Sequence, residues 1–316
     1  MKRNLFTLLL LSAVHFANGQ TDIDALMMAK NNFCVGGTYS HSSWKYYWEG
    51  TLKRENLNLG TVSSNVFAAM GNYGITDKLN AIFSLPYIKT QASAGTLHSD
   101  QGVQDLSLWL KWMPVEKKLT ANSVFSLYTL GGFSTPLSNY QADYLPMAIG
   151  AHSTNVSGRL MVDYQNKDFF ATASGTYQYR SNIKIDRTSY YTDEMHNTNE
   201  VEMPDVASYN VRTGIRTFRV IAEAFFQQNF TLGGFDITRN NMPFPSNKMN
   251  VSLVGAHVKY VFKKLPSLSV ETGGSYVVRG RNVGKATEFN GSVFYIIPFG
   301  HSKVSASHSC KLCGLR

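Results

Sequence analysis

Eleven or so segments of the chain, each about ten residues long, alternate apolar and polar side chains with a period of two. In residues 103–113, Leu106 and Leu108 lie on one face of an extended strand, whereas Asp105 and Lys111 lie on the other. Successive side chains of a strand point to opposite faces, so the two sets face different surroundings. Because the pattern recurs along most of the chain, it predicts a transmembrane antiparallel up-and-down β-barrel, an all-β fold.

The pattern predicts about 12 strands, which lie near residues 33–44, 61–73, 79–90, 103–114, 119–134, 153–165, 169–185, 205–217, 218–232, 250–262, 268–281 and 286–299. Hydrocarbon cannot satisfy the free N–H and C=O groups of a sheet edge, so we expect the first and last strands to pair.

Short and long connections alternate along this order. The short ones include residues 75–78, 114–117, 166–168 and 263–266, and the long ones include 45–60, 91–102, 135–152, 186–204 and 233–248. Membrane barrels have short periplasmic turns and longer extracellular loops. The alternation therefore predicts that the long loops face outside.

The first 19 residues have the features of a secretory leader. Lys2 and Arg3 form a basic start, residues 5–16 are mostly apolar, and the small residues of 17–19 provide a cleavage site. This apolar run is too short for a membrane-spanning helix, and a buried N-terminal helix is the alternative. We expect a signal peptide over residues 1–19, the barrel over residues 33–299 and a tail over residues 300–316.

Residues 20–32 precede the first strand and allow two interpretations. Ile23, Leu26, Met27 and Lys30 fall at helical spacing, so the segment could fold into the barrel lumen as a plug. Chain ends are usually loose unless they are docked, so a disordered periplasmic lead-in is the alternative.

The composition narrows the function classes. The chain has 30 basic and 21 acidic residues and a formal charge of +9, but the basic residues are scattered, so we expect no nucleic-acid binding. Aromatic residues make up 13% of the chain, which suits the aromatic girdles of a membrane barrel. Cys310 and Cys313 form a C-x-x-C pair without a second ligand pair, so we expect no metal or other cofactor.

The polar faces of the strands supply the candidate functional residues. In the predicted register, the charged side chains that face the lumen have both signs and could line a narrow aqueous path. The alternative is that they pair and satisfy one another, as buried charges must. The candidates are Asp105, Lys111, Arg159, Asp163, Arg180, Arg212, Arg216, Glu223, Lys259, Glu271, Arg279 and Glu288.

A catalytic set is not apparent in the sequence. The chain has no G-x-S-x-G elbow and no paired-carboxylate motif. His257 lies next to Lys259 on a predicted inward face, but a hydrogen-bonded lumen histidine explains it better. We therefore expect no enzyme.

Four stretches of the chain resemble a known family. They are residues 72–80 (NYGITDKLN), 83–87 (FSLPY), 102–111 (GVQDLSLWLK) and 132–136 (GFSTP). They resemble the outer-membrane family named for the meta-pathway of phenol degradation, which is similar to the fatty-acid-transporter-like barrels. Residues 27–33 (MMAKNNF) and 47–50 (YWEG) resemble stretches in uncharacterised members of that family from Bacteroidetes.

The resemblance implies a channel in the bacterial outer membrane for passive uptake of a small solute, with hydrophobic or aromatic molecules as the first candidates. The predicted membrane barrel implies outer-membrane lipid and the barrel-assembly machinery as partners, and the resemblance suggests the plug interpretation of residues 20–32. The alternative is a structural or adhesive barrel that acts through its outer loops, where Tyr140, Tyr144, Tyr190 and Tyr191 would provide contact surface. A soluble secreted β-protein is the main structural alternative.

Overall fold

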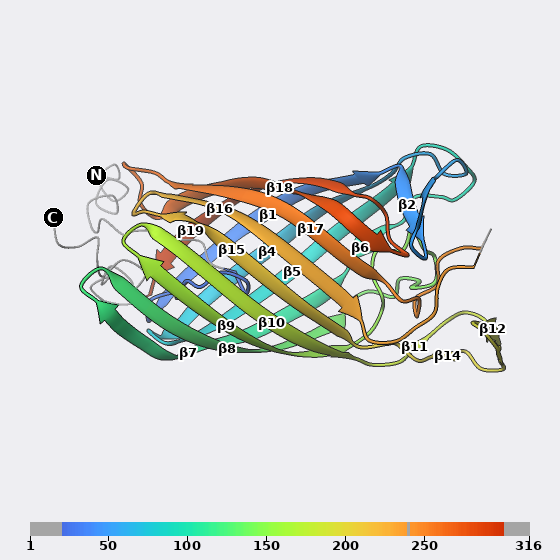
Figure 1. Cartoon of the computed structure of the whole chain (residues 1–316), viewed down its shortest axis with the longest axis horizontal. Helices are drawn as coiled ribbons and strands as arrows, with labels where there is room; N and C mark the ends of the chain where they lie inside the picture. Colours follow the sequence, from blue (N-terminus) through green and yellow to red (C-terminus); the bar gives the residue numbers. More distant parts are fainter. Residues whose placement is uncertain (1–20, 239–240, 300–316) are drawn as a thin grey trace, which may run out of the picture.

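The computed structural model describes residues 21–238 and 241–299, and in this part of the chain 12 long antiparallel strands form a closed barrel (Figure 1). The barrel strands are β1 (Asn32–Trp44), β4 (Val62–Thr76), β5 (Leu79–Ala92), β7 (Asp105–Thr120), β8 (Ser123–Pro136), β9 (Asn155–Asn166), β10 (Phe169–Arg180), β15 (Val206–Arg216), β16 (Val220–Thr231), β17 (Asn250–Val261), β18 (Leu268–Arg281) and β19 (Thr287–Pro298).

The first and last of these strands close the barrel. Strand β1 pairs with β4 on one side and with β19 on the other, so that Cys34 lies opposite both Asn72 and Ile296. Each remaining strand pairs with its neighbours in the chain, so every long strand has two partners. The prediction of an antiparallel barrel of about 12 strands is confirmed.

The two ends of the barrel differ in how the strands are connected. Tight turns join the strands at one end, and long loops project from the other, to the left and right of Figure 1 respectively. The loops carry the short strands β2 (Tyr46–Glu49), β3 (Leu52–Glu55), β6 (Gln101–Val103), β11 (Ile183–Lys184), β12 (Tyr190–Tyr191), β13 (Met195–His196) and β14 (Glu200–Val201). This segregation matches the periplasmic and extracellular ends of an outer-membrane barrel.

The strands present an apolar face outward. On β7, Leu110 and Trp112 are 55% and 51% exposed, whereas Lys111 between them is 0% exposed and points into the barrel. An exposed apolar band combined with a polar interior is the arrangement that a lipid bilayer requires. Within the described ranges, the chain has no helix that is long and apolar enough to cross a membrane.

Two local expectations are wrong. Residues 114–117 do not form a turn, because β7 continues to Thr120 across a register shift between Trp112 and Val115. A bulge accommodates Pro114, which cannot donate a ladder hydrogen bond. The strand predicted to end at residue 185 ends at Arg180, and Ile183 and Lys184 instead pair with β14 in the outer loops.

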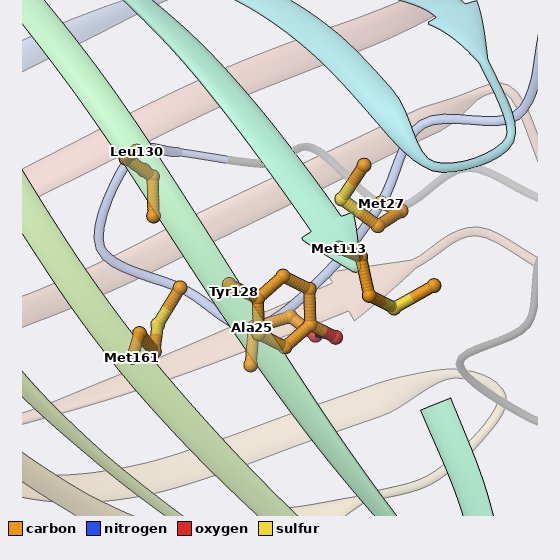
Figure 2. Packing of buried hydrophobic residues seen from close by; sticks show 6 residues of the cluster. All are labelled: Ala25, Met27, Met113, Tyr128, Leu130 and Met161. Carbon is orange, nitrogen blue, oxygen red and sulfur yellow. Dashed lines mark hydrogen bonds between the residues drawn. The ribbon is translucent and has the colours of Figure 1, made fainter. Parts of the chain in front are cut away.

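The N-terminal segment, residues 21–31, lies inside the barrel. Ala25 and Met27 pack against inward-facing side chains of β7, β8 and β9 (Figure 2). Leu26 packs against Phe170 and Ile221, and Met28 belongs to a third cluster with Cys34. The apolar core of the lumen is therefore built around this segment.

Candidate functional site: the lumen and the outer vestibule

The N-terminal segment contains no helix in the structure. Its four consecutive residues Ala25, Leu26, Met27 and Met28 are all at most 5% exposed, because inward-facing walls surround the segment on several sides. A helix with one apolar stripe would bury only residues three or four positions apart. The helical spacing of Ile23, Leu26, Met27 and Lys30 predicts a segment that folds into the lumen. The segment does lie in the lumen, but its backbone is irregular and not helical.

Lys111 fixes the segment through a buried ion pair. Its Nζ lies 3.0 Å from Oδ1 of Asp24 and donates to the backbone carbonyls of Asp24 at 2.5 Å and Thr21 at 3.0 Å. A fully buried ammonium group needs a counter-charge and hydrogen-bond acceptors, because burial would otherwise be very costly. All of these partners come from the N-terminal segment.

Arg159 forms a second attachment to the segment. Its Nη1 lies 2.9 Å from Oδ2 of Asp22 and 2.8 Å from the carbonyl oxygen of the same residue. The guanidinium group lies 4.8 Å from the ring centroid of Trp109, and its Nε donates to Oγ1 of Thr176 at 2.7 Å. The two ion pairs, Lys111–Asp24 and Arg159–Asp22, are called the carboxylate clamp below.

Backbone groups of the segment are also satisfied by the barrel. The hydroxyl of Tyr128 donates to the carbonyl of Ala25 at 2.8 Å, and Nδ2 of Asn80 donates to the carbonyl of Met28 at 3.1 Å. At the periplasmic end, the backbone N–H of Lys30 donates to Asp77 at 3.0 Å. Irregular chain inside a barrel needs such partners for its peptide groups.

An inner cavity of about 190 Å³ lies between the N-terminal segment and the wall formed by β1, β4 and β15–β19. At about 30 Å³ per water, it has room for about six water molecules. Eight of its lining residues are ionisable: Asp24, Arg212, Arg216, Glu223, His257, Lys259, Glu271 and Glu288.

One network of these side chains crosses four neighbouring strands. Arg212 on β15 pairs with Glu223 on β16, and His257 Nδ1 on β17 lies 3.6 Å from Oε1 of Glu223 and 3.9 Å from Oε1 of Glu271. Glu271 on β18 also lies 4.0 Å from Nζ of Lys259. The two basic side chains, Arg212 and Lys259, thus balance the two carboxylates, Glu223 and Glu271.

A second network lies beside the first. Arg216 Nη1 is 3.2 Å from Oδ2 of Asp163 and 3.3 Å from Oε1 of Gln165, and its guanidinium lies 4.0 Å from the ring centroid of Phe170. Thr172 donates to Asp163 at 2.5 Å. Paired and hydrogen-bonded charges of this kind stabilise the interior without offering a free charge to a solute.

The structure places the other sequence candidates at the ends of the strands. Asp105 accepts a hydrogen bond from the Tyr140 hydroxyl near the outer loops, and Arg180 Nε donates to the carbonyl of Pro204 at 2.7 Å. Glu288 lines the inner cavity and accepts from Ser275 at 3.4 Å.

Arg279 does not face the lumen, contrary to the prediction. The register between β17 and β18 shifts between Ser252 and Leu253, so Arg279 lies opposite Ser252 while Val277 lies opposite Leu253. Ser252 contacts Gln228 on the outer face of β16, and Arg279 is exposed on the same side. The bulge adds one residue to β18 and thereby moves Arg279 to the opposite face.

A second cavity, called the outer vestibule, lies among the extracellular loops and measures about 600 Å³. None of its described lining residues is Asp, Glu, His, Lys or Arg. Its walls are mostly apolar and aromatic, with four asparagines among them. The described lining residues are Trp44, Tyr47, Asn56, Asn58, Leu59, Gly95, Thr96, Leu97, Leu145, Pro146, Ile237, Asn241, Met242, Pro243, Met249, Asn282, Val283 and Gly284.

Asn282 connects three of the loops that form this vestibule. Its Oδ1 accepts from the backbone N–H groups of Gly50 at 2.7 Å and Ile237 at 3.2 Å. Its Nδ2 donates to Oδ1 of Asp236 at 2.7 Å and to the carbonyl of Lys248 at 2.8 Å. All hydrogen-bonding positions of this 3% exposed carboxamide are therefore occupied.

Asp236 and Arg281 reinforce the same junction. Arg281 donates to both carboxylate oxygens of Asp236, at 2.8 Å and 2.5 Å. The hydrogen bonds from Arg281 hold the pKa of Asp236 below its ordinary value of 3.8, although desolvation acts in the opposite direction. The carboxylate therefore stays ionised throughout the neutral and mildly acidic range.

Sequence reasoning missed the acidic partners and the vestibule. Asp22 and Asp24 were not recognised as the counter-charges of Arg159 and Lys111, although two aspartates beside an apolar run were visible. The vestibule residues come from loops far apart in the chain, so no local signal identified them. Among the described residues, no group of three or more His, Cys, Asp or Glu side chains could hold a metal ion.

Together, the closed barrel, its apolar outer band and its polar lumen define a transmembrane β-barrel of the bacterial outer membrane. The model of the family described as "Putative MetA-pathway of phenol degradation" matches residues 57–304, and the chain belongs to this family. No curated protein matches the chain significantly.

One solved outer-membrane barrel that is similar to this chain has a TM-score above 0.5. The COG4313 outer membrane channel from Pseudomonas putida F1 superposes with a TM-score of 0.66 at 14% sequence identity, over 89% of this chain and 100% of that one. The toluene transporter TodX from Pseudomonas putida has a TM-score of 0.42 at 11% identity, over 86% and 90% of the two chains. OprD from Pseudomonas aeruginosa has a TM-score of 0.37 at 11% identity, over 75% and 66%.

Proposed function

We propose that the protein is an outer-membrane channel for passive uptake of a small, uncharged solute that combines an apolar body with a hydrogen-bonding group. The observation that carries this proposal is the outer vestibule, which is apolar, bears amide groups and has no charged side chain among its described lining residues. Its volume of about 600 Å³ is within the range of small-molecule sites. A charged solute would lose hydration there without gaining a partner.

The inner cavity accounts for the hydrogen-bonding part of the proposed solute. It lies at the middle of the strands and is lined by ion pairs and by hydroxyl groups, such as those of Thr38 and Ser292. A purely apolar molecule would have no hydrogen bonds to offer these groups, whereas a hydroxyl or amide on an apolar body would. Phenol, which the description of the family mentions, has both features.

The N-terminal segment acts as a plug in this proposal. The carboxylate clamp and the buried residues 25–28 attach it to the barrel wall, and it borders the inner cavity with Thr21, Ile23, Asp24 and Leu26. It therefore limits the size of what can pass. Residues 21–31 determine the pore size in this proposal, and the barrel interior determines its polarity.

Solute flux into liposomes tests the proposal. Phenyl β-glucoside and phenyl β-glucuronide have about the same size and differ by one carboxylate, and both cross bare bilayers slowly. We expect liposome swelling with the glucoside to exceed that with the glucuronide by about tenfold, the ratio that 1.4 kcal/mol of discrimination produces. Equal rates for the two solutes, or no flux of either through folded protein, would contradict the proposal.

A structural or adhesive role is the second candidate, and two residues favour it. Tyr191 and Met195 on the loop of residues 186–204 are 59% and 61% exposed. Tyr140 and Tyr190, in contrast, are buried at 8% and 9% and stabilise the loops internally. If this role were the correct one, trimming residues 186–204 would abolish adhesion while leaving solute flux intact.

Three further features belong to the proposal. We infer that the protein is not an enzyme, that the apolar outer band is surrounded by outer-membrane lipid, and that the barrel-assembly machinery inserts the chain. The apolar outer band supports the inference about lipid, because a surface of this kind faces hydrocarbon.

A further inference from the structure

Three basic side chains lie on the outer surface of the barrel, towards its extracellular end, and do not belong to the solute path. They are Lys53 on β3, Arg279 on β18 and Lys285 in the loop between β18 and β19. The β2–β3 hairpin lies against this loop. The backbone N–H of Lys285 donates to the carbonyl of Tyr46 at 2.7 Å, and the backbones of Tyr47 and Gly284 form an antiparallel β-bridge. These three residues are called the rim cluster below.

The carboxylates near the rim cluster already have other partners. Glu55 lies 2.7 Å from Nζ of Lys45, and Glu49 lies 2.8 Å from Nε of Arg54. Within the described part of the chain, Lys53, Arg279 and Lys285 have no carboxylate within ion-pair distance, so a net positive charge remains at this position. It lies outside the barrel wall and therefore does not act on the lumen.

The two lysines also lie beside each other. The hydrogen bond with the Tyr276 hydroxyl raises the pKa of Lys285 above its ordinary value, and the side chain of Lys53 reaches Lys285 as well. Lys285 is therefore charged at neutral pH. An anion between these two basic side chains would interact favourably with both of them.

Aromatic rings accompany both ammonium groups. Lys53 Nζ lies 4.8 Å from the ring centroid of Tyr46, and Lys285 Nζ lies 5.0 Å from that of Tyr276. Tyr46 and Tyr276 are 41% and 39% exposed. Tyrosines are enriched in membrane proteins at the boundary between the hydrocarbon and the headgroups.

The lipid-facing surface continues directly below the rim cluster. Val278 and Phe289 on β18 and β19 are 45% and 67% exposed and belong to the apolar outer band. The bulge in β18 that turns Arg279 away from the lumen places its guanidinium on this same outer surface. The basic side chains therefore lie beside the extracellular edge of the apolar outer band.

We propose that the rim cluster binds the phosphate groups of a phosphorylated glycolipid in the outer leaflet, the chemistry that lipid A presents. Ammonium and guanidinium groups bind phosphate through charge-assisted hydrogen bonds, and clustered basic residues at a membrane surface recognise anionic headgroups. The acyl chains of such a lipid would lie on Val278 and Phe289. This inference does not depend on the proposed transport function.

Retention of lipid A by the purified, folded protein in detergent tests the proposal, with bound lipid quantified by mass spectrometry. We expect K53Q/K285Q to bind diphosphoryl lipid A about tenfold more weakly than the wild type, and K53R/K285R to bind it as the wild type does. The matched control is K263Q/K264Q, which removes two lysines at the periplasmic end and should leave binding unchanged. Heat-modifiable gel mobility verifies that each variant is folded.

Competition experiments on the wild type keep the proposal testable even if a variant does not fold. Monophosphoryl lipid A should bind more weakly than the diphosphoryl form, and phosphatidylglycerol and inorganic phosphate should compete poorly. The proposal is overturned if K53Q/K285Q retains as much lipid A as the wild type, if both lysine pairs matter equally, or if phosphatidylglycerol competes as well as lipid A does.

Discussion

The two cavities of this barrel differ in the number of ionisable side chains that line them. The inner cavity is lined by eight ionisable residues, whereas the described lining of the outer vestibule contains none of Asp, Glu, His, Lys and Arg. In the inner cavity the charges are paired across strands, and in the vestibule hydrogen bonds of asparagines hold the loops together. In the proposed function, the vestibule selects a solute by its apolar body and the inner cavity selects it by its hydrogen-bonding group.

The largest expected effect comes from removing the charges that join the N-terminal segment to the lumen. The variant D22N/D24N leaves Lys111 and Arg159 without their carboxylates, and loss of one partner of a buried ion pair costs about 3–5 kcal/mol. We expect a lower temperature for the heat-induced shift in gel mobility and a noisier, larger conductance. The matched control, D143N, breaks the exposed pair with Arg187 and should change neither measurement appreciably.

The next effect concerns the junction of the outer loops. Asn282 has a φ of +54° and satisfies two backbone N–H groups, so N282A leaves buried donors without partners at about 1–3 kcal/mol each. We expect faster proteolysis of the loops around residues 45–60 and 233–248. N282G relieves the backbone strain but not the lost hydrogen bonds, so it should be nearly as susceptible. Protection equal to that of the wild type in both variants would show that the junction is unimportant.

Smaller changes are expected from truncating the vestibule walls. The variants W44A and M242A each remove apolar surface that a ring would contact, and we expect about tenfold weaker binding of a neutral aromatic probe, or about 1.4 kcal/mol. Quenching of the fluorescence of 1-naphthol measures this binding. H257Q in the inner cavity should leave binding at the vestibule unchanged. If H257Q weakens binding as much as W44A, the two cavities do not act separately.

The smallest effect is a pH dependence of the vestibule. Because the folded-state pKa of Asp236 is held below 3.8, its ion pair with Arg281 contributes fully above that pH and is lost only as the pH falls below it. We expect binding of 1-naphthol to be constant from pH 8 to about pH 5 and to decline only in stronger acid. D236N should remove this acid-dependent decline. A midpoint near neutral pH would instead implicate a different group.

Much of the fold could be predicted because alternation at period two is a local property of each strand. The faces of Lys111 and Arg159 followed directly from it. The prediction was wrong for Arg279, because one extra residue in β18 reverses every face beyond the bulge. The turn expected at residues 114–117 was wrong for a similar reason, since a proline is tolerated in a strand at a bulge.

The site could be predicted only in part, because its residues meet through tertiary structure. The lumen candidates were found one by one, but their pairing across β15, β16, β17 and β18 depends on strand register. The carboxylate partners of Lys111 and Arg159 lie 87 and 137 residues earlier in the chain. The vestibule assembles from separate loops, which carry no periodic signal.

Single-channel conductance in planar bilayers, measured for the folded protein with and without residues 21–31, tests the account most directly. The account predicts a small, steady conductance for the intact chain and a several-fold larger one for the truncated chain, because the segment occupies the lumen beside the inner cavity. Equal conductance in both forms, or none in either form while gel mobility shows a folded barrel, would contradict the account of a plugged channel.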